Sequence, residues 1–129
     1  MTAIIGYEQA AKILGEFRFS EFLIVRELRF YETPSGSSPT QNIELIVECE
    51  RRSPNYRLEL RFSGVSGLKL QHFGGGQTRI IGLDILDVSQ KQWEGISWEV
   101  IDYEHDDLAF FAKTAEIVSI AAVTRDDRL

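Results

Sequence analysis

The sequence is poor in the residue types that hold small proteins together by covalent or metal links. Its 129 residues include one cysteine, Cys49, and two histidines, His72 and His105. A single cysteine excludes an intrachain disulfide and a thiolate cluster, and a zinc site needs three or four converging ligands. We therefore expect no metal and no cofactor. Cys49 alternates in phase with the apolar residues of its segment, which predicts a core position.

The chain also lacks long apolar runs and an excess of basic charge. No run reaches the roughly 18 residues needed to cross a bilayer, and no basic segment followed by an apolar stretch resembles a signal peptide. With 14 basic against 20 acidic side chains, the net charge is −6. We therefore expect a cytoplasmic protein that binds neither membranes nor nucleic acid.

Length and composition are those of one folded domain over residues 1–129. Hydrophobic residues make up 43% of the chain, which is enough for a core, and no linker or repeat divides it. Residues 1–15 are predicted to form an N-terminal helical segment, because apolar side chains recur at helical spacing from Tyr7 to Leu14 and Gly15 supplies a stop. Residues 124–129 are expected to be a frayed tail.

From residue 22 onward the apolar pattern changes to a period of two, which is typical of strands. Tyr56 to Phe62 is the clearest case, and Trp98 alternates in phase with Ile96 and Val100, so we expect it inside. Turn signals recur about every 8–12 residues without helical crossovers. The sequence therefore predicts an α+β fold, in which a short N-terminal helix precedes a mainly antiparallel, bent β-sheet or sandwich of about seven to eight strands.

Glycine and proline positions predict the connections between these strands. Residues 33–42 are expected to form a flexible hairpin loop. Gly74–Gly76 lacks the lysine and the helix start of a phosphate-binding loop, so we interpret it as a hairpin turn. One strand over residues 79–88 should follow. Its apolar side chains point to one side of the sheet: Ile81, Leu83 and Ile85.

Charged side chains predict the register of two neighbouring strands. Glu44, Glu48 and Glu50 lie on the polar face of one strand, and Arg57 and Arg61 lie on the polar face of the next. Opposite charges that face each other across a ladder help to fix which residues pair.

The negative charge is concentrated in one segment, residues 84–107. It holds eight acidic residues and one base, Lys91, whereas the remaining 105 residues carry a net charge of +1. Three interpretations compete: a solvated edge that keeps the protein soluble, a docking face for a basic protein, and a hard-cation site at residues 104–107. The spacing of the last does not match a calcium loop. Trp93 and Tyr103, in the same segment, are of types favoured at binding hot spots.

The C-terminal half resembles a group of small bacterial proteins that includes immunity proteins of polymorphic toxin systems. The resemblance rests on the runs Leu83–Ser89, Gln92–Ile96, Val100–Glu104 and Leu108–Ala112, and it covers about a third of the chain. It implies a small cytoplasmic protein that binds a toxin domain and does no chemistry. It carries over no catalytic residue.

We therefore expect a non-enzymatic protein-binding module, of the immunity type, whose acidic C-terminal half engages a basic partner such as a toxin domain. The candidate docking residues are Asp84, Asp87, Glu94, Asp102, Glu104, Asp106, Asp107, Trp93 and Tyr103. Two alternatives stay open. One is a β-fold that encloses an apolar small molecule between inward aromatic residues, namely Phe22, Phe30, Tyr56, Phe62, Phe110 and Phe111. The other is a homo-oligomeric structural protein that pairs through exposed strand edges.

Overall fold

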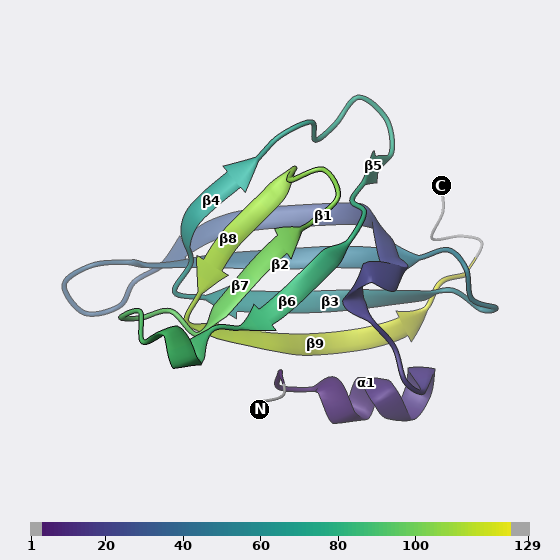
Figure 1. Cartoon of the computed structure of the whole chain (residues 1–129), viewed down its shortest axis with the longest axis horizontal. Coiled ribbons are helices and arrows are strands. Elements are labelled where there is room, and N and C mark those ends of the chain that lie inside the picture. The colour runs from purple at the N-terminus through teal and green to yellow at the C-terminus, as the bar shows by residue number, and fades with distance from the viewer. Residues whose placement is uncertain (1–3, 125–129) are drawn as a thin grey trace.

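Two β-sheets pack face to face, and a short helix lies beside the larger sheet (Figure 1). The computed structural model describes residues 4–124, so residues 125–129 of the expected tail lie outside the described residues. The elements in chain order are α1 (Tyr7–Leu14), η1 (Phe19–Glu21), β1 (Phe22–Thr33), β2 (Thr40–Cys49), β3 (Tyr56–Ser63), β4 (Ser66–Leu70), β5 (Thr78–Arg79), β6 (Leu83–Asp87), η2 (Ser89–Lys91), β7 (Trp98–Asp102), β8 (Leu108–Ala112) and β9 (Thr114–Ala122). The predicted α+β class and the predicted helix are confirmed.

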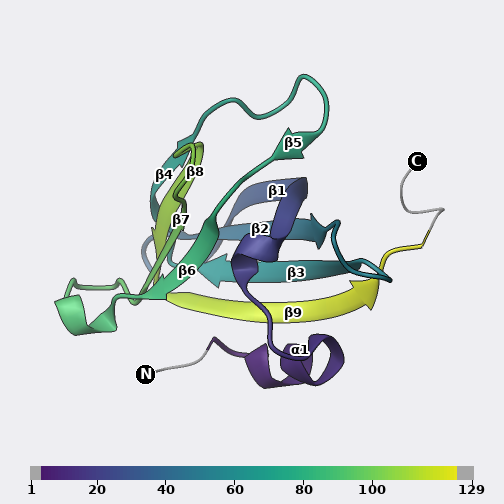
Figure 2. The same cartoon turned by 45° about the vertical axis from the view of Figure 1, so that its right-hand side comes forward.

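The large sheet has the strand order β5-β1-β2-β3-β9 and the small sheet has the order β4-β8-β7-β6, with antiparallel pairing throughout. Figures 1 and 2 show the small sheet in front, its strands running steeply across those of the large sheet. The core fills the space between them. Phe62 of β3 and Phe110 of β8 meet edge to face with ring centroids 5.0 Å apart. Trp98 and Cys49 are buried, as predicted.

The connection from β4 to β6 differs from the prediction. Gly74–Gly76 have positive φ but form no hairpin, because β4 pairs with β8 instead of the strand that follows it. The predicted strand over residues 79–88 is broken in two. β5 pairs with β1 of the large sheet, and the chain then crosses to the small sheet at Gly82 (φ 83°). This crossing leaves Ile81 42% exposed and raises the strand count within residues 4–124 to nine.

The predicted loop over residues 33–42 is shorter than expected, because β1 runs to Thr33 and β2 begins at Thr40. Phe30 near the end of β1 is 48% exposed, so its predicted inward position is wrong. The long β1–β2 hairpin extends beyond the area that the small sheet covers (Figure 1), which leaves its tip without an apolar partner layer.

Ion pairs cover the outer face of the large sheet. Glu44 of β2 pairs with Arg29 on β1 and Arg61 on β3, as the pattern predicted for Arg61. Burial of the Glu44 carboxyl raises its pKa, but hydrogen bonds from Arg29 and Tyr31 outweigh this effect and hold the pKa below its usual range. The charge of Glu44 is therefore neutralised within the sheet.

Glu48 and Glu50, at and just beyond the end of β2, pair with arginines of different strands. Glu48 is 3% exposed and lies between Arg26 and Arg57 at N–O distances of 3.0 and 2.6 Å. Glu50 pairs with Arg79 of β5 and not with an arginine of β3, because β5 adds to the other side of the sheet.

One arginine in the β2–β3 turn holds α1 and η1 in place. Arg52 donates to the Leu14 carbonyl at 2.7 Å and to the Glu16 carbonyl at 3.3 Å, and it pairs with Glu21 of η1. A cation at the C-terminal end of a helix satisfies carbonyl groups that have no partner within the helix. The turn therefore fixes where the helical segment ends.

The start of α1 is held against β9 by close backbone contact. The Ile117 amide donates to the Ile5 carbonyl at 2.7 Å, and Gly6 caps the helix with φ 89°. A Cβ atom at Gly6 would lie 2.5 Å from the Ile117 oxygen. Only glycine fits this approach.

We predict that Gly6→Ala destabilises the protein more than Gly75→Ala. Both positions have positive φ, so both substitutions strain the backbone by about 1–2 kcal/mol. Only the alanine at position 6 also collides with backbone, because nothing lies within 4 Å of a Cβ at position 75. Urea unfolding of the two variants measures the difference. An equal decrease in the free energy of unfolding for both variants would show that the backbone of β9 moves to accommodate the extra methyl group without destabilising the protein.

Candidate functional site

The outer face of the small sheet combines apolar and acidic side chains. Strand alternation directs Leu83, Ile85, Val100, Leu108 and Phe110 into the core, where all are buried. Their neighbours point outward. Register places Asp84 beside Ile101, and Glu99 between Leu86 and Phe111. We call this set, Asp84, Leu86, Glu99, Ile101 and Phe111, the outer face.

Tyr103 extends the outer face where β7 ends. Its side chain is 58% exposed. Partial desolvation of the phenol, followed by the negative charges of Asp84 and Glu99, raises the pKa of Tyr103. The structure therefore brings together two predicted site residues, Asp84 and Tyr103, with Glu99.

Trp93 covers the opposite end of the same face. The β6–β7 connection folds back so that the Trp93 ring meets Phe111 edge to face, with centroids 5.6 Å apart. The Lys91 ammonium lies 5.0 Å from the centre of the indole ring. Trp93 remains 44% exposed and the adjacent Glu94 is exposed. This end offers an aromatic surface with one acid and one base.

The β7–β8 hairpin holds three more predicted residues, of which two are already paired. Asp106 lies 2.5 Å from the Lys69 ammonium of β4, and Asp107 lies 2.8 Å from Nδ1 of His72. Glu104 is exposed, and the structure gives it no ion-pair partner within residues 4–124. Of the three, Glu104 keeps its charge available to a partner.

Asp102 does not belong to the surface. Its side chain is fully buried, and one carboxylate oxygen accepts the Leu108 amide at 2.8 Å, across the base of the hairpin. The other oxygen has no hydrogen-bond partner among the described residues. The prediction that Asp102 docks a partner is wrong because Asp102 alternates in phase with Trp98 and Val100, which are inward.

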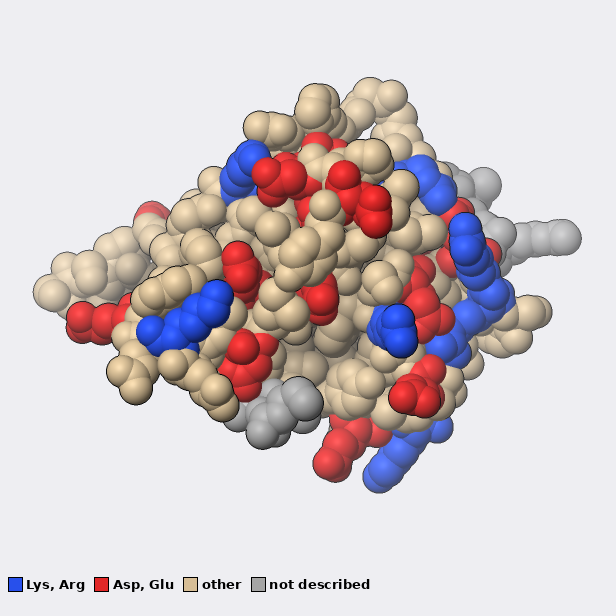
Figure 3. Space-filling model, in the orientation of Figure 1, with Lys and Arg blue, Asp and Glu red and all other residues tan. Residues whose placement is uncertain are grey.

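Figure 3 shows acidic side chains gathered over the face that carries the small sheet, with basic side chains towards its margins. Buried Asp102 apart, four carboxylates of the 84–107 segment lack an ion-pair partner among the described residues: Asp84, Glu94, Glu99 and Glu104. The large sheet, by contrast, neutralises Glu44 and Glu48. The two faces therefore differ at their centres, where Glu44 and Glu48 are paired with arginines and Asp84 and Glu99 are not.

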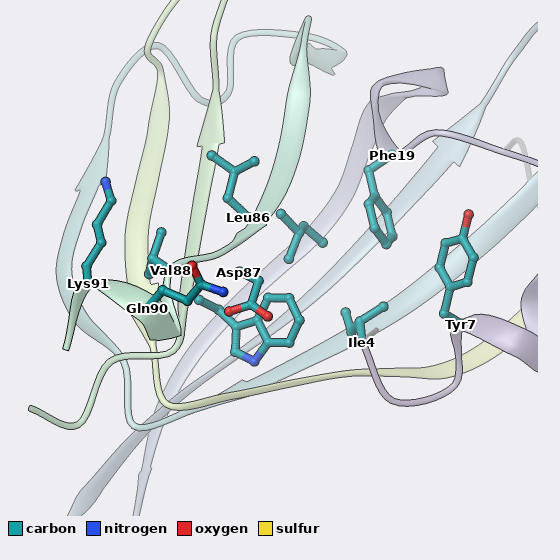
Figure 4. Close-up of a pocket in the computed structure, with 10 residues that line it drawn as sticks. Ile4, Tyr7, Phe19, Leu86, Asp87, Val88, Gln90 and Lys91 are labelled. Carbon is teal, nitrogen blue, oxygen red and sulfur yellow. The ribbon is translucent and has the colours of Figure 1, made fainter. Parts of the chain in front are cut away.

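A cleft of about 900 Å³ opens beside β6, the edge strand of the small sheet. Figure 4 shows Ile4, Tyr7 and Phe19 on one side and Leu86, Val88, Gln90 and Lys91 on the other, with Asp87 between them. Asp87 has the same inward phase as Leu83 and Ile85, and it lies at this cleft, where its carboxylate accepts the amide and hydroxyl of Ser89 at 2.9 and 2.6 Å.

The aromatic residues proposed to enclose a ligand do not line this cleft. Phe22, Phe62 and Phe110 point inward as expected, but they pack the core, and Phe111 lies on the outer face. No group of three or more potential metal ligands occurs within residues 4–124, and the helices described there are too short or too polar to cross a membrane.

Sequence reasoning missed four members of the outer face: Leu86, Glu99, Ile101 and Phe111. Their signal was present as alternation with Ile85, Val100 and Phe110, since neighbours of buried residues in a strand point the other way. Relating the four to one another required the register of β6, β7 and β8.

The structure is thus that of a small protein with two packed sheets, one of which presents an outer face of apolar and acidic side chains. The family of immunity protein PIM8 matches residues 9–118, so the chain belongs to this family. The match extends well beyond the C-terminal third on which the resemblance rested. Comparisons with curated proteins and with solved structures found no match.

We predict that Asp102→Ala costs about 1–3 kcal/mol in the free energy of unfolding, because the buried Leu108 amide loses its acceptor. Asp102→Asn keeps an oxygen in that position, and we expect it to stay closer to the parent protein. Thermal or urea unfolding checks both, with Glu104→Ala as the exposed control. Equal stability of all three variants would contradict a structural role for the buried carboxylate.

Proposed function

We propose that this protein is an immunity protein that neutralises a toxin domain by binding it, with the outer face of the small sheet as its acidic docking surface. The partner presents a basic surface. The observation that carries the proposal is the group of four carboxylates without ion-pair partners, Asp84, Glu94, Glu99 and Glu104, beside exposed Tyr103 and Trp93.

The physics of association supports this assignment. Unpaired charges of one sign speed the encounter with an oppositely charged partner and make binding depend on salt. Exposed aromatic side chains, surrounded by polar groups, are typical anchors at the centre of an interface. Membership in the immunity protein family is consistent with a protein partner and with binding as the whole activity.

We expect the gene next to that of this chain to encode the toxin domain, and the test uses this domain in purified form. In the triple variant Asp84→Asn, Glu99→Gln, Glu104→Gln, we expect the affinity to fall about tenfold or more at low salt, because three attractive charges are lost. The difference should shrink at high salt, where screening already weakens these attractions. Isothermal titration calorimetry at two salt concentrations measures both effects.

The matched control removes the same number of charges from the rest of the surface. Glu8, Glu16 and Glu27 are exposed and lie outside the small sheet, so the triple glutamine variant of these residues should bind nearly as well as the parent. If both triple variants lose the same affinity for the toxin domain, the loss follows from net charge alone, and the outer face is rejected as the docking surface.

A further inference from the structure

The edge of the small sheet offers backbone groups to a further strand. β6 pairs with β7 on one side only. Hydrogen bonds from Tyr103 to Gly82 and from Val88 to Ser97 fix the phase of this pair, because bonded pairs alternate along an antiparallel ladder. It follows that Ile85 and Asp87 direct their backbone N–H and C=O groups away from β7 and toward the cleft. Leu83 has the same phase, but it is only 1% exposed and β6 also lies against η1, so the open part of the edge is Ile85–Asp87.

A carboxylate closes the middle of this edge. Asp84 Oδ1 accepts the Ile85 amide at 2.9 Å, so the central donor of the open side is taken by the preceding side chain. Charged side chains are a common means of keeping edge strands from pairing at random. Asp84 has no ion-pair partner within residues 4–124, so a cation that approaches it meets an uncompensated charge.

We propose that β6 adds an extended, basic segment of the toxin partner as a further strand, and that a lysine or arginine of this segment draws the Asp84 carboxylate away from the Ile85 amide. This inference rests on the proposed function and specifies how the toxin partner binds to the edge of the small sheet. The released amide then donates to a carbonyl of the added strand, as in other cases of strand addition.

The surroundings of β6 specify the side chains of that segment. Successive residues of a strand point to opposite sides. On one side they would lie near Asp84 and the outer face, where a cation is favoured. On the other they would enter the cleft, whose walls include Ile4, Phe19 and Trp98. The segment therefore alternates basic and apolar residues.

Charge complementarity selects this occupant over the others. A second copy that paired through β6 would bring Asp84 and Asp87 close to the same acidic residues of its partner, and like charges that face each other in a sheet are destabilising. A small apolar molecule would leave the backbone groups of the edge unused, in a cleft that opens to solvent along β6.

Two substitutions at position 84 distinguish the release of the Ile85 amide from a simple attraction between charges. Asp84→Asn and Asp84→Ala both remove the charge, but asparagine keeps an oxygen that caps the Ile85 amide whereas alanine leaves the amide open. The proposal predicts that Asp84→Asn binds the toxin domain about tenfold more weakly than Asp84→Ala, roughly the effect of one backbone hydrogen bond. The matched control is Glu99, where the Gln and Ala variants should bind alike because its carboxylate accepts no backbone amide among residues 4–124.

Calorimetry with the same purified toxin domain gives the affinities, and amide exchange measured by NMR gives the state of the edge. We expect the Ile85 amide to exchange more slowly in the complex than in the free protein.

Equal affinities of the Asn and Ala variants, or an Ile85 amide whose exchange is not slowed in the complex, would overturn the inference while the proposed function stands. A free Asp84→Ala protein that dimerises through β6 and no longer binds toxin would assign the edge to a second copy. Failure of the parent protein to bind the toxin domain would reject both proposals.

Discussion

The burial of one apolar face of each sheet against the other is the constraint on which the molecule depends. Phe62 and Phe110 meet at its centre, and the residues around them are almost entirely removed from water. To fill both layers, the chain leaves the large sheet after β3, returns to it for β5 and leaves it again at Gly82. The small sheet uses one face for the core, so its other face and its β6 edge are left for a partner.

The two outer faces treat charge in opposite ways. On the large sheet, arginines on β1 and β3 flank each glutamate of β2, and this lattice holds the register of three strands. On the small sheet, Asp84 and Glu99 have no such neighbours, and their charges raise the pKa of Tyr103. The same residue type thus stabilises pairing on one face and remains available for electrostatic attraction on the other.

Local periodicity was enough to predict α1, the alternation of β3 and the burial of Trp98, because each depends on residues close in sequence. It failed where the choice of partner strand decides the structure. Gly74–Gly76 looks like a hairpin turn, yet the chain crosses between sheets there, since β8 and not β6 completes the pairing of β4. Asp102 shows the reverse case: it alternates in phase with buried Trp98, and the prediction that it docks a partner followed its charge instead of this phase. The cap on Ile85 depends on side-chain placement that no sequence pattern carries.

The contacts of α1 also determine when the fold can close during synthesis. The helix is made before every strand, but its C-terminal carbonyl finds Arg52 only 38 residues later, and Ile5 bonds to Ile117 near the other end of the described chain. Contacts so distant in sequence form late, after the entropy of closing long loops has been overcome. Tyr7 and Phe19, which line the cleft beside β6, are therefore made before every described strand and are among the last residues to reach their final positions.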